Sequence, residues 1–448
     1  MNLEKLIDED PAGGVFRVHR AAFTSTEIAA LEHANVFQHC WLYLGHDSEI
    51  PNAGDFRRRT VAGQPLFWVR GSDGRARVFY NSCTHWGANV CRVDEGNAEL
   101  FQCFYHAWTF NNKGDLVSVP DEAGYGEGFH KEAMGLVSPP RVDHYRGLYF
   151  VSFNRDVEDL VSYLRDAKEY IDLILDQSEE GWRVVPGAQK YSVRANWKMF
   201  SLNSLDSYHV RPLHSTFFKY TDSMGSGDPP PLPSSDFPGP QGRSLSLGNG
   251  HGVDVFPSLA RARPIAHWHP ILGEESKEEI RNRRARLVEK FGEERAYVMC
   301  NTNRLMLIYP NFALHDIAGV SLRYFEPVGQ EYMEVTVQTL APRGESAALL
   351  NRRLENFLSF LGPGGFAHPD DIEAMESAQM GFRAGGPEWI DASRGMHREP
   401  TALDELHVRA FWRQWHANVL GNAQAQRNQD SLEGRAISEG AKNDGHAR

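Results

Sequence analysis

Short hydrophobic runs separated by turn residues fill the stretch from Trp41 to about Val151. SDG lies between PLFWVR and RARVFY, and NNKG lies between AWTF and DLVSV. Strand-like segments joined by such Gly-, Asn- and Asp-containing turns are typical of β-hairpins. We therefore predict a compact all-β domain over residues 41–155.

The pattern differs on both sides of this stretch. Ser25 or Thr26 can cap a short helix in TSTEIAALEHANVF, so we expect an N-terminal helical lead over residues 1–40. Helical periodicity appears in VEDLVSYLRDAKEYIDLIL and again in SKEEIRNRRARLVEKFGEERAYV, ALLNRRLENFLSFL and ALDELHVRAFWRQWHANVL. The strand-like runs LMLIYP, AGVSLRYFEPV and YMEVTVQTLAP lie among these helices. Together they predict a mixed α+β domain over residues 156–421, with an antiparallel sheet.

Two segments lack such periodicity. Residues 221–253 are rich in Gly, Pro and Ser, which predicts a long loop. Two interpretations of this loop remain open, namely a lid or entrance to a site and an ordinary surface loop. Residues 422–448 are polar, which predicts a disordered tail.

Composition narrows the class of protein. The 448 residues are 41% hydrophobic and 24% charged, as in ordinary globular proteins, and the net charge of −12 argues against a nucleic-acid partner. The first residues show no signal-peptide pattern, and no segment approaches the length of a transmembrane helix. Five cysteines make no disulfide framework. We therefore expect a cytoplasmic protein that uses a few cysteines as ligands.

Two short loops each supply one cysteine and one histidine, as Cys83-x-His85 and Cys103-x-x-His106. Each pair ends a predicted strand, so two hairpin tips can bring four ligands together. Zinc sites more often use paired cysteines, whereas one Cys and one His from each loop matches a Rieske [2Fe–2S] centre. Structural zinc and a purely structural role remain the alternatives. We interpret the remaining nearby thiol, Cys91, as a buried core residue.

A second group occurs in ANWKMFSLNSLDSYHVRPLH. Asp206 and His209 are three residues apart, which would put them on one helix face. His214 follows beyond Pro212, which should end or kink the helix and let His214 turn back. Two imidazoles and a distant carboxylate would form the 2-His-1-carboxylate site of non-haem iron enzymes. By itself this spacing is weak, because the chain has 19 histidines.

The two motifs together resemble the alpha (large, catalytic) subunits of Rieske-type aromatic-ring-hydroxylating dioxygenases. CTHWGANVCRVDEGNAELFQCFYHAWTFNNKGDL is similar to their Rieske segment, and N-W-K followed by D-x-Y-H-x(4)-H is similar to their mononuclear iron motif. Three positions depart from the family pattern: Trp86 replaces an Arg, Ala107 replaces a Gly, and Leu202 replaces a Glu. The resemblance implies a Rieske domain followed by a helix-grip catalytic domain.

The resemblance also implies roles for individual residues. The third iron ligand would come from GPGGFAHPDDIEAMESAQMGF, where Pro369 suits the first turn of a helix. Asp371 matches the ligand, and Asp370 is the rival. Asp206 would link the two metal centres across a subunit boundary, contacting His209 in its own chain and His106 or His85 in the next. A solvated surface role for Asp206 is the alternative.

The chain looks most similar to oxygenases that act on aromatic carboxylates such as benzoate, cumate and terephthalate. In that comparison Arg323 lies on a strand where it could bind a substrate carboxylate, and an ordinary surface arginine is the alternative. Asn203 and Leu307 are further candidates for the substrate pocket.

The function implied is that of a terminal oxygenase that uses O2 to cis-dihydroxylate an aromatic ring. Electrons would come from NAD(P)H through a separate reductase or ferredoxin, because the chain lacks a dinucleotide fingerprint. The implied assembly is a homotrimer of alpha subunits, with or without small beta subunits. A Rieske monooxygenase or demethylase is one alternative. The other is a Rieske electron carrier or a zinc-binding protein without oxygenase chemistry.

Overall fold

The computed structural model describes residues 2–228, 238–258, 265 and 267–421. Its first large part consists of three small antiparallel sheets. Their orders are β6-β5-β4-β7, β10-β9-β8 and β11-β12-β3. The strands are β3 (Leu42–His46), β4 (Asp55–Val61), β5 (Gln64–Arg70), β6 (Ala76–Tyr80), β7 (Glu95–Asn97), β8 (Leu100–Gln102), β9 (Thr109–Asn111), β10 (Leu116–Ser118), β11 (Arg141–Tyr145) and β12 (Leu148–Ser152).

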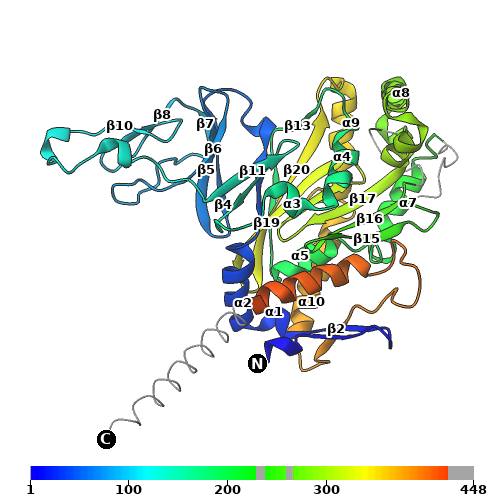
Figure 1. Ribbon diagram of the computed structural model, residues 1–448. Helices are drawn as coiled ribbons and strands as arrows, with labels where there is room; N and C mark the ends of the chain where they lie inside the picture. The colour runs from blue at the N-terminus through cyan, green and yellow to red at the C-terminus, as the bar shows by residue number, and fades with distance from the viewer. Residues whose placement is uncertain (1, 229–237, 259–264, 266, 422–448) are drawn as a thin grey trace, which may run out of the picture.

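Both predicted hairpins are present. Strands β5 and β6 pair across the SDG turn, and β9 and β10 pair across NNKG. In Figure 1 the region around β8 and β10 extends away from the rest of the molecule as an arm. A separate small apolar core supports this arm, built around Phe67, Trp108 and Phe110. The arm can therefore present its loops to another molecule.

The second part is built on one eight-stranded antiparallel sheet. Its order is β13-β20-β19-β18-β17-β16-β15, and β14 also pairs with β20. The strands are β13 (Trp182–Val184), β14 (Gln189–Val193), β15 (Arg243–Gly248), β16 (His251–Pro257), β17 (Thr302–Ile308), β18 (Phe312–Asp316), β19 (Val320–Gly329) and β20 (Tyr332–Pro342). The prediction of an all-β domain followed by an α+β domain is confirmed.

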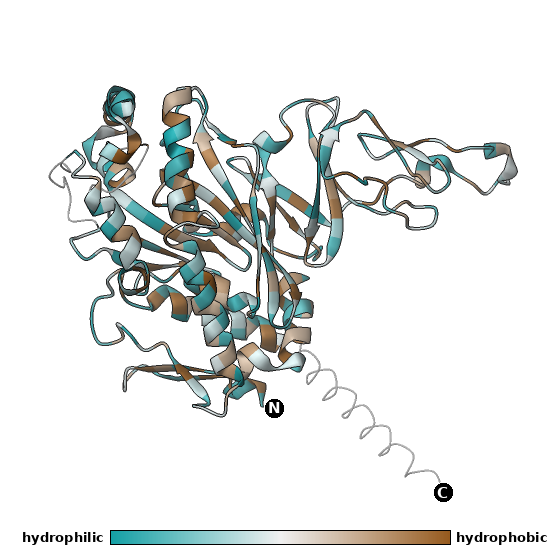
Figure 2. Ribbon diagram, turned by 180° about the vertical axis from the view of Figure 1, so that it is seen from behind, coloured by the Kyte–Doolittle hydropathy of each residue, from teal (hydrophilic) through white to brown (hydrophobic). Residues whose placement is uncertain are grey.

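Helices pack around this sheet. They are α3 (Leu160–Leu164), α4 (Ala167–Leu175), α5 (Trp197–Asn203), α6 (Val210–Leu213), α7 (Ser215–Ser223), α8 (Lys277–Asn301), α9 (Ala347–Leu361), α10 (His368–Arg383) and a helix over residues 406–421. Single turns of other helix types occur at Leu3–Lys5, His33–Phe37, Asp47–Glu49, Glu122–Gly124, Lys131–Ala133, Pro270–Leu272 and Glu274–Ser276. Figure 2 shows hydrophobic and hydrophilic bands along the helices, as expected where one face covers a sheet.

The N-terminal segment is only partly the predicted helical lead. Helices α1 (Ala21–Thr24) and α2 (Thr26–Glu32) are present, and the Ser25 hydroxyl caps α2 by accepting the Ile28 N–H at 3.3 Å. Before them, however, β1 (Ile7–Asp10) and β2 (Val15–His19) form a hairpin that pairs with β21 (Trp389–Asp391). The purely helical prediction is wrong there, because β1 and β2 pair with each other and β21, from the far end of the chain, adds a third strand.

The predicted long loop is also partly wrong. Strand β15 and the start of β16 lie within residues 221–253, and they form the edge of the large sheet. Residues 229–237 lie outside the described part of the structure, as does the predicted tail, residues 422–448. Within the described ranges, no helix is both long and apolar enough to span a membrane.

Candidate active site and metal centres

The two Cys/His loops have matching backbone geometry. In each, the N–H four residues after the cysteine donates to the cysteine carbonyl: Gly87 to Cys83 at 2.8 Å, and Ala107 to Cys103 at 2.9 Å. The positive φ of 77° at Gly87 and 57° at Ala107 closes each turn. The sequence therefore builds two equivalent turns, each with its cysteine at the base.

The four side chains of these loops converge. Cys83 and Cys103 are buried close enough to interact, and burial and the second thiol raise the pKa of Cys83. The rings of His85 and His106 lie 4.5 Å apart between centroids. Nδ1 of His85 is buried and has no hydrogen-bond partner among the described residues. A buried imidazole nitrogen without a partner, beside two buried thiols, fits a metal centre with mixed Cys and His ligands.

The surroundings of these loops differ from one side to the other. The Trp108 ring stacks on His85 at 4.8 Å and shields it. Cys91 is buried, as expected, and burial raises its pKa to about 11. Trp86, by contrast, is 68% exposed at the tip of its loop. The inner side of the cluster loops is thus sealed, and the tip is open.

Helix α5 is anchored at its first turn by the N-W-K motif. The Asn196 side chain caps the helix by accepting the Lys198 N–H at 3.1 Å. The Trp197 indole donates to the buried Glu32 carboxylate at 2.8 Å, and the Lys198 ammonium pairs with the same group. Trp415 donates to it at 2.6 Å. A buried carboxylate with three such partners fixes where α5, α2 and the helix over residues 406–421 meet.

Asp206 and His209 do not share a regular helix face, contrary to the prediction. Both lie in the turn between α5 and α6. The Asp206 carboxylate accepts the Tyr208 N–H at 2.6 Å through Oδ1, and its Oδ2 lies 3.0 Å from His209 Nδ1. This contact lowers the pKa of Asp206 against the effect of burial. The acid therefore orients the imidazole, with Nε2 on the opposite side of the ring.

His209, His214 and Asp371 meet beside that Nε2. His209 Nε2 lies 3.4 Å from Asp371 Oδ1, and His214 Nε2 lies 3.2 Å from the same oxygen. Helix α6 ends at Leu213, just after Pro212, which lets His214 turn back. Burial opposes ionisation of Asp371, but the two imidazoles hold its pKa far below the usual value. One ligand atom from each residue lies within 4.8 Å of the others, as a metal site requires.

Asp370 has a different environment. Its side chain is 44% exposed, and its nearer oxygen lies 3.8 Å from His214 Nδ1. Asp371 is buried in the first turn of α10 and points at both imidazoles.

The Asp206 and Asp371 carboxylates raise the pKa of His209 to about 9 although burial would lower it. Three ligand groups so close together suit a cation better than hydrogen bonds alone.

A cavity of about 90 Å³ opens beside these residues. Its lining comprises Asn203, His209, Val210, His214, Phe217, Phe218, Phe256, Asn303, Leu305, His315, Ile317, Ala318, Arg323, Phe360, Leu361 and Asp371. The Asn203 amide donates to Asp371 at 3.1 Å. Leu307 is not among the lining residues, so its prediction as a substrate contact is not supported. Leu305 occupies the place expected for it, two residues earlier on the same strand face.

Among the residues that the structure describes, Arg323 is the one arginine that lines this cavity. Its side chain is buried, and one Nη donates to His315 Nδ1 at 3.2 Å. Its Nε and its other Nη have no hydrogen-bond partner within the described ranges. His315 in turn donates through Nε2 to the Ser204 carbonyl at 3.0 Å, and burial beside Arg323 keeps its pKa well below the usual value. Arg323 therefore lines an aromatic-walled cavity with two guanidinium nitrogens, Nε and one Nη, lacking a hydrogen-bond partner among the described residues.

Comparisons with known proteins agree with this geometry. Residues 40–136 match the model of the Rieske [2Fe-2S] domain, and residues 165–421 match that of the ring-hydroxylating alpha subunit, catalytic domain. This chain belongs to the ring-hydroxylating alpha subunits. It is the large subunit of a Rieske non-haem iron ring-hydroxylating dioxygenase, with a [2Fe–2S] cluster and a mononuclear iron site at the His209, His214 and Asp371 group.

Individual relatives support the same family. The chain is 34% identical to the toluate 1,2-dioxygenase alpha subunit of Pseudomonas putida over 88% of this chain and 84% of the relative. It is 33% identical to the anthranilate 1,2-dioxygenase large subunit of Acinetobacter baylyi, over 88% and 83%. Naphthalene 1,2-dioxygenase with bound indole superposes with a TM-score of 0.80 at 26% identity, covering 94% of this chain and 95% of that structure.

Sequence reasoning missed most of the cavity. The walls contributed by Phe217, Phe360 and Asn303 come from three separate elements, and no local pattern connects them. It also missed Glu32, because a single acid in an amphipathic helix gives no sign of being buried. The four predicted cluster residues and the three predicted iron-site residues lie together in the structure as two groups.

The departure at Ala107 leads to a prediction. A left-handed conformation costs an alanine about 1 kcal/mol, and glycine adopts it freely. Ala107→Gly should therefore stabilise the cluster loop by about 0.5–1 kcal/mol. We expect a higher denaturant midpoint for loss of the cluster's visible absorbance.

Gly87→Ala is the matched control, since a Cβ there would lie no closer than 3.7 Å to its neighbours and tests the backbone alone. It should lower the midpoint by a similar amount. If Ala107→Gly lowers the midpoint, or both changes leave it unaltered, backbone strain does not limit this loop.

Proposed function

We propose that this subunit cis-dihydroxylates the ring of a one-ring aromatic carboxylate whose acid group pairs with Arg323. The observation that carries the proposal is the buried guanidinium in the iron-site cavity, with Nε and one Nη lacking partners among the described residues. An unpaired buried cation costs several kcal/mol. A carboxylate ligand would remove that cost with charge-assisted, bidentate hydrogen bonds.

The rest of the cavity suits the ring of such an acid. Phe217, Phe360 and Leu305 supply apolar walls, and the small volume favours one ring over fused rings. A neutral hydrocarbon would leave Arg323 without a counter-charge, so the same residue disfavours it. The names of the toluate, anthranilate and 2-halobenzoate dioxygenases among the relatives support this substrate class.

We further propose individual ligands for both metal groups. Cys83, His85, Cys103 and His106 would hold the [2Fe–2S] cluster, and His209, His214 and Asp371 would hold the mononuclear iron. Three protein ligands leave positions open, and the iron, when bound, supplies the dioxygen chemistry. Asn203 would hold the Asp371 carboxylate in place through its amide.

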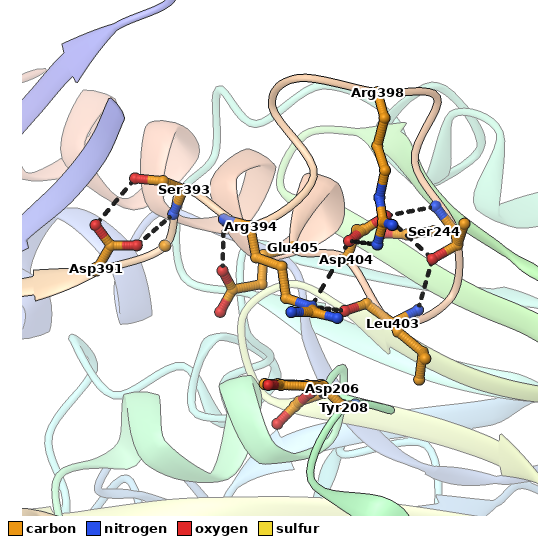
Figure 3. Close-up of polar contacts among 12 residues, drawn as sticks. Asp206, Tyr208, Ser244, Asp391, Ser393, Arg394, Arg398, Leu403, Asp404 and Glu405 are labelled. Atoms are coloured by element: carbon orange, nitrogen blue, oxygen red, sulfur yellow. Dashed lines mark hydrogen bonds and ion pairs between the residues drawn. The ribbon is translucent and has the colours of Figure 1, made fainter. Parts of the chain in front are cut away.

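Asp206 has a separate proposed role between the two centres. It orients His209 through Oδ2, and its side chain is 34% exposed. Figure 3 shows Asp206 and Tyr208 facing the loop that carries Arg394 and Glu405. We propose that His106 or His85 of the partner subunit meets Asp206 here, which would link a Rieske cluster to a neighbour's iron.

The proposed assembly follows from that link. Transfer between chains requires an oligomer, which we propose is a homotrimer of alpha subunits, with or without small beta subunits. Electrons would enter from NAD(P)H through a separate reductase or ferredoxin. We keep the division into residues 1–40, 41–155 and 156–421 as the proposed domain organisation.

The ligand assignment predicts different outcomes for two adjacent acids. Asp371→Ala should lower the iron content from about three to about two per chain, because the cluster stays and the mononuclear iron leaves. Asp370→Ala, which removes an exposed carboxylate from the same helix turn, should keep about three. Iron and labile sulfide counted on anaerobically purified protein decide the matter. Loss of iron from the Asp370 variant and not from the Asp371 variant would reverse the assignment.

The substrate assignment predicts a selective loss at Arg323. Arg323→Met should weaken the binding of benzoate-type acids about 100-fold, since a buried charge pair is worth about 2–5 kcal/mol. Binding of the corresponding neutral ring, such as toluene in place of toluate, should not weaken. Arg323→Lys keeps the charge and should recover part of the affinity for the acid.

Equilibrium binding to the anaerobic reduced protein measures both ligands, and the melting temperature controls for folding. An Arg323→Met variant that binds benzoates as tightly as the unchanged protein would rule out the carboxylate assignment. Equal weakening for acid and neutral ring would mean a general disruption of the cavity.

A further inference from the structure

A buried histidine from the far end of the chain holds the backbone beside Asp206. His407 lies in the helix over residues 406–421, and its imidazole is fully enclosed. Its Nε2 donates to the Leu205 carbonyl at 2.5 Å. The residue that precedes Asp206 is therefore fixed by an element unrelated to the iron motif in sequence.

The residue that follows Asp206 is held by the partner of that histidine. The Ser207 hydroxyl donates to Asp254 Oδ2 at 2.5 Å. The other oxygen of Asp254 lies 3.3 Å from His407 Nε2. Asp254 lies on β16 and is completely buried. The buried pair of His407 and Asp254 thus makes hydrogen bonds to the residues on both sides of Asp206. We call this pair the clamp.

Two further features show that this place is shaped around the imidazole. Ser244 Oγ on β15 lies 2.6 Å from His407 Nδ1, so both ring nitrogens are engaged. Gly252 on β16 lies against the base of this side chain, and a Cβ there would lie 2.7 Å from His407 Cβ. Only glycine lets the histidine approach so closely. Strands β15 and β16 and the segment that carries Asp206 therefore all contact the His407 side chain.

The pair also acts electrostatically. Burial would lower the pKa of His407, but the Asp254 carboxylate raises it above the usual value. The same burial raises the pKa of Asp254, and His407 contributes to keeping the pKa of Asp206 low. Burying an acid and an imidazole together costs desolvation that apolar side chains would avoid, which points to a role beyond stability.

We infer that His407 and Asp254 are positioning residues that hold Asp206 at the distance where its carboxylate orients His209. The inference rests on the proposed role of Asp206. The clamp contacts Leu205 and Ser207 on the inner side of the turn, while the Asp206 side chain itself stays partly exposed. The acid can then contact its own imidazole and a partner subunit without moving.

The test compares two buried histidines. His407→Ala removes the clamp. His251→Ala is the control, because His251 is equally buried and lies on the same strand as Asp254. Both of its ring nitrogens are also hydrogen-bonded, in this case to backbone groups at 2.8 Å and 2.9 Å. Both variants should lose similar thermal stability, since each leaves a comparable cavity.

Only His407→Ala should slow electron transfer from the cluster to the iron. In a single turnover of the reduced holoenzyme with benzoate and O2, we expect recovery of the oxidised cluster's absorbance to be about 10- to 100-fold slower. His407→Gln retains a donor for the Leu205 carbonyl and should recover most of the rate. Ser207→Ala, a smaller change at the other end of the clamp, should show a partial loss even if His407→Ala does not fold.

Asp206→Asn separates the inference from the role on which it rests. If the clamp acts through Asp206, adding His407→Ala to Asp206→Asn should cause no further slowing. An Asp206→Asn variant with the unchanged rate would overturn the proposed role of Asp206. If Asp206→Asn is slow while His407→Ala and Ser207→Ala match the His251→Ala control, the positioning role is wrong and that of Asp206 stands.

Discussion

The convergence of Asp371 with the imidazoles of His209 and His214 is the contact on which the rest of the catalytic part depends. These side chains come from α10 and from the irregular chain around α6, and neither segment could hold this geometry alone. The N-W-K turn fixes the start of α5 through the buried Glu32. The first turn of α10 then delivers the carboxylate. Rigid anchoring on both sides keeps three ligand atoms close enough for one ion.

Charge is distributed unevenly around this centre. The iron group itself holds one buried carboxylate and two imidazoles, and Arg323 adds a buried cation a short way along the cavity wall. On that wall the Arg323 guanidinium donates to His315, whose pKa is held well below its usual value. A substrate anion would complete this arrangement, with its ring against the phenylalanines. Under the proposed function, binding of the acid group would also place the ring beside the iron site.

The sequence predicted those parts of the site whose ligands are local. Cys83 with His85 and Cys103 with His106 are each confined to one turn, so spacing alone indicated a shared centre. Asp371 needed the family resemblance, because nothing in its own segment shows that it meets His209. Leu307 stays a prediction outside the cavity lining, since strand alternation gives the face of a residue but not its distance from the cavity. The β15–β16 hairpin was missed because composition around residues 221–253 hid its strands, and His407 was missed because its partners lie in three distant segments.

The most direct test of the account is the fate of labelled dioxygen. Chemically reduced protein should be mixed with benzoate or toluate and ¹⁸O2, and the product analysed by mass spectrometry and NMR. The account predicts a cis-dihydrodiol that keeps the carboxylate and carries label in both new hydroxyl groups. A product with one labelled oxygen, or turnover of neutral rings but not of the acids, would contradict it.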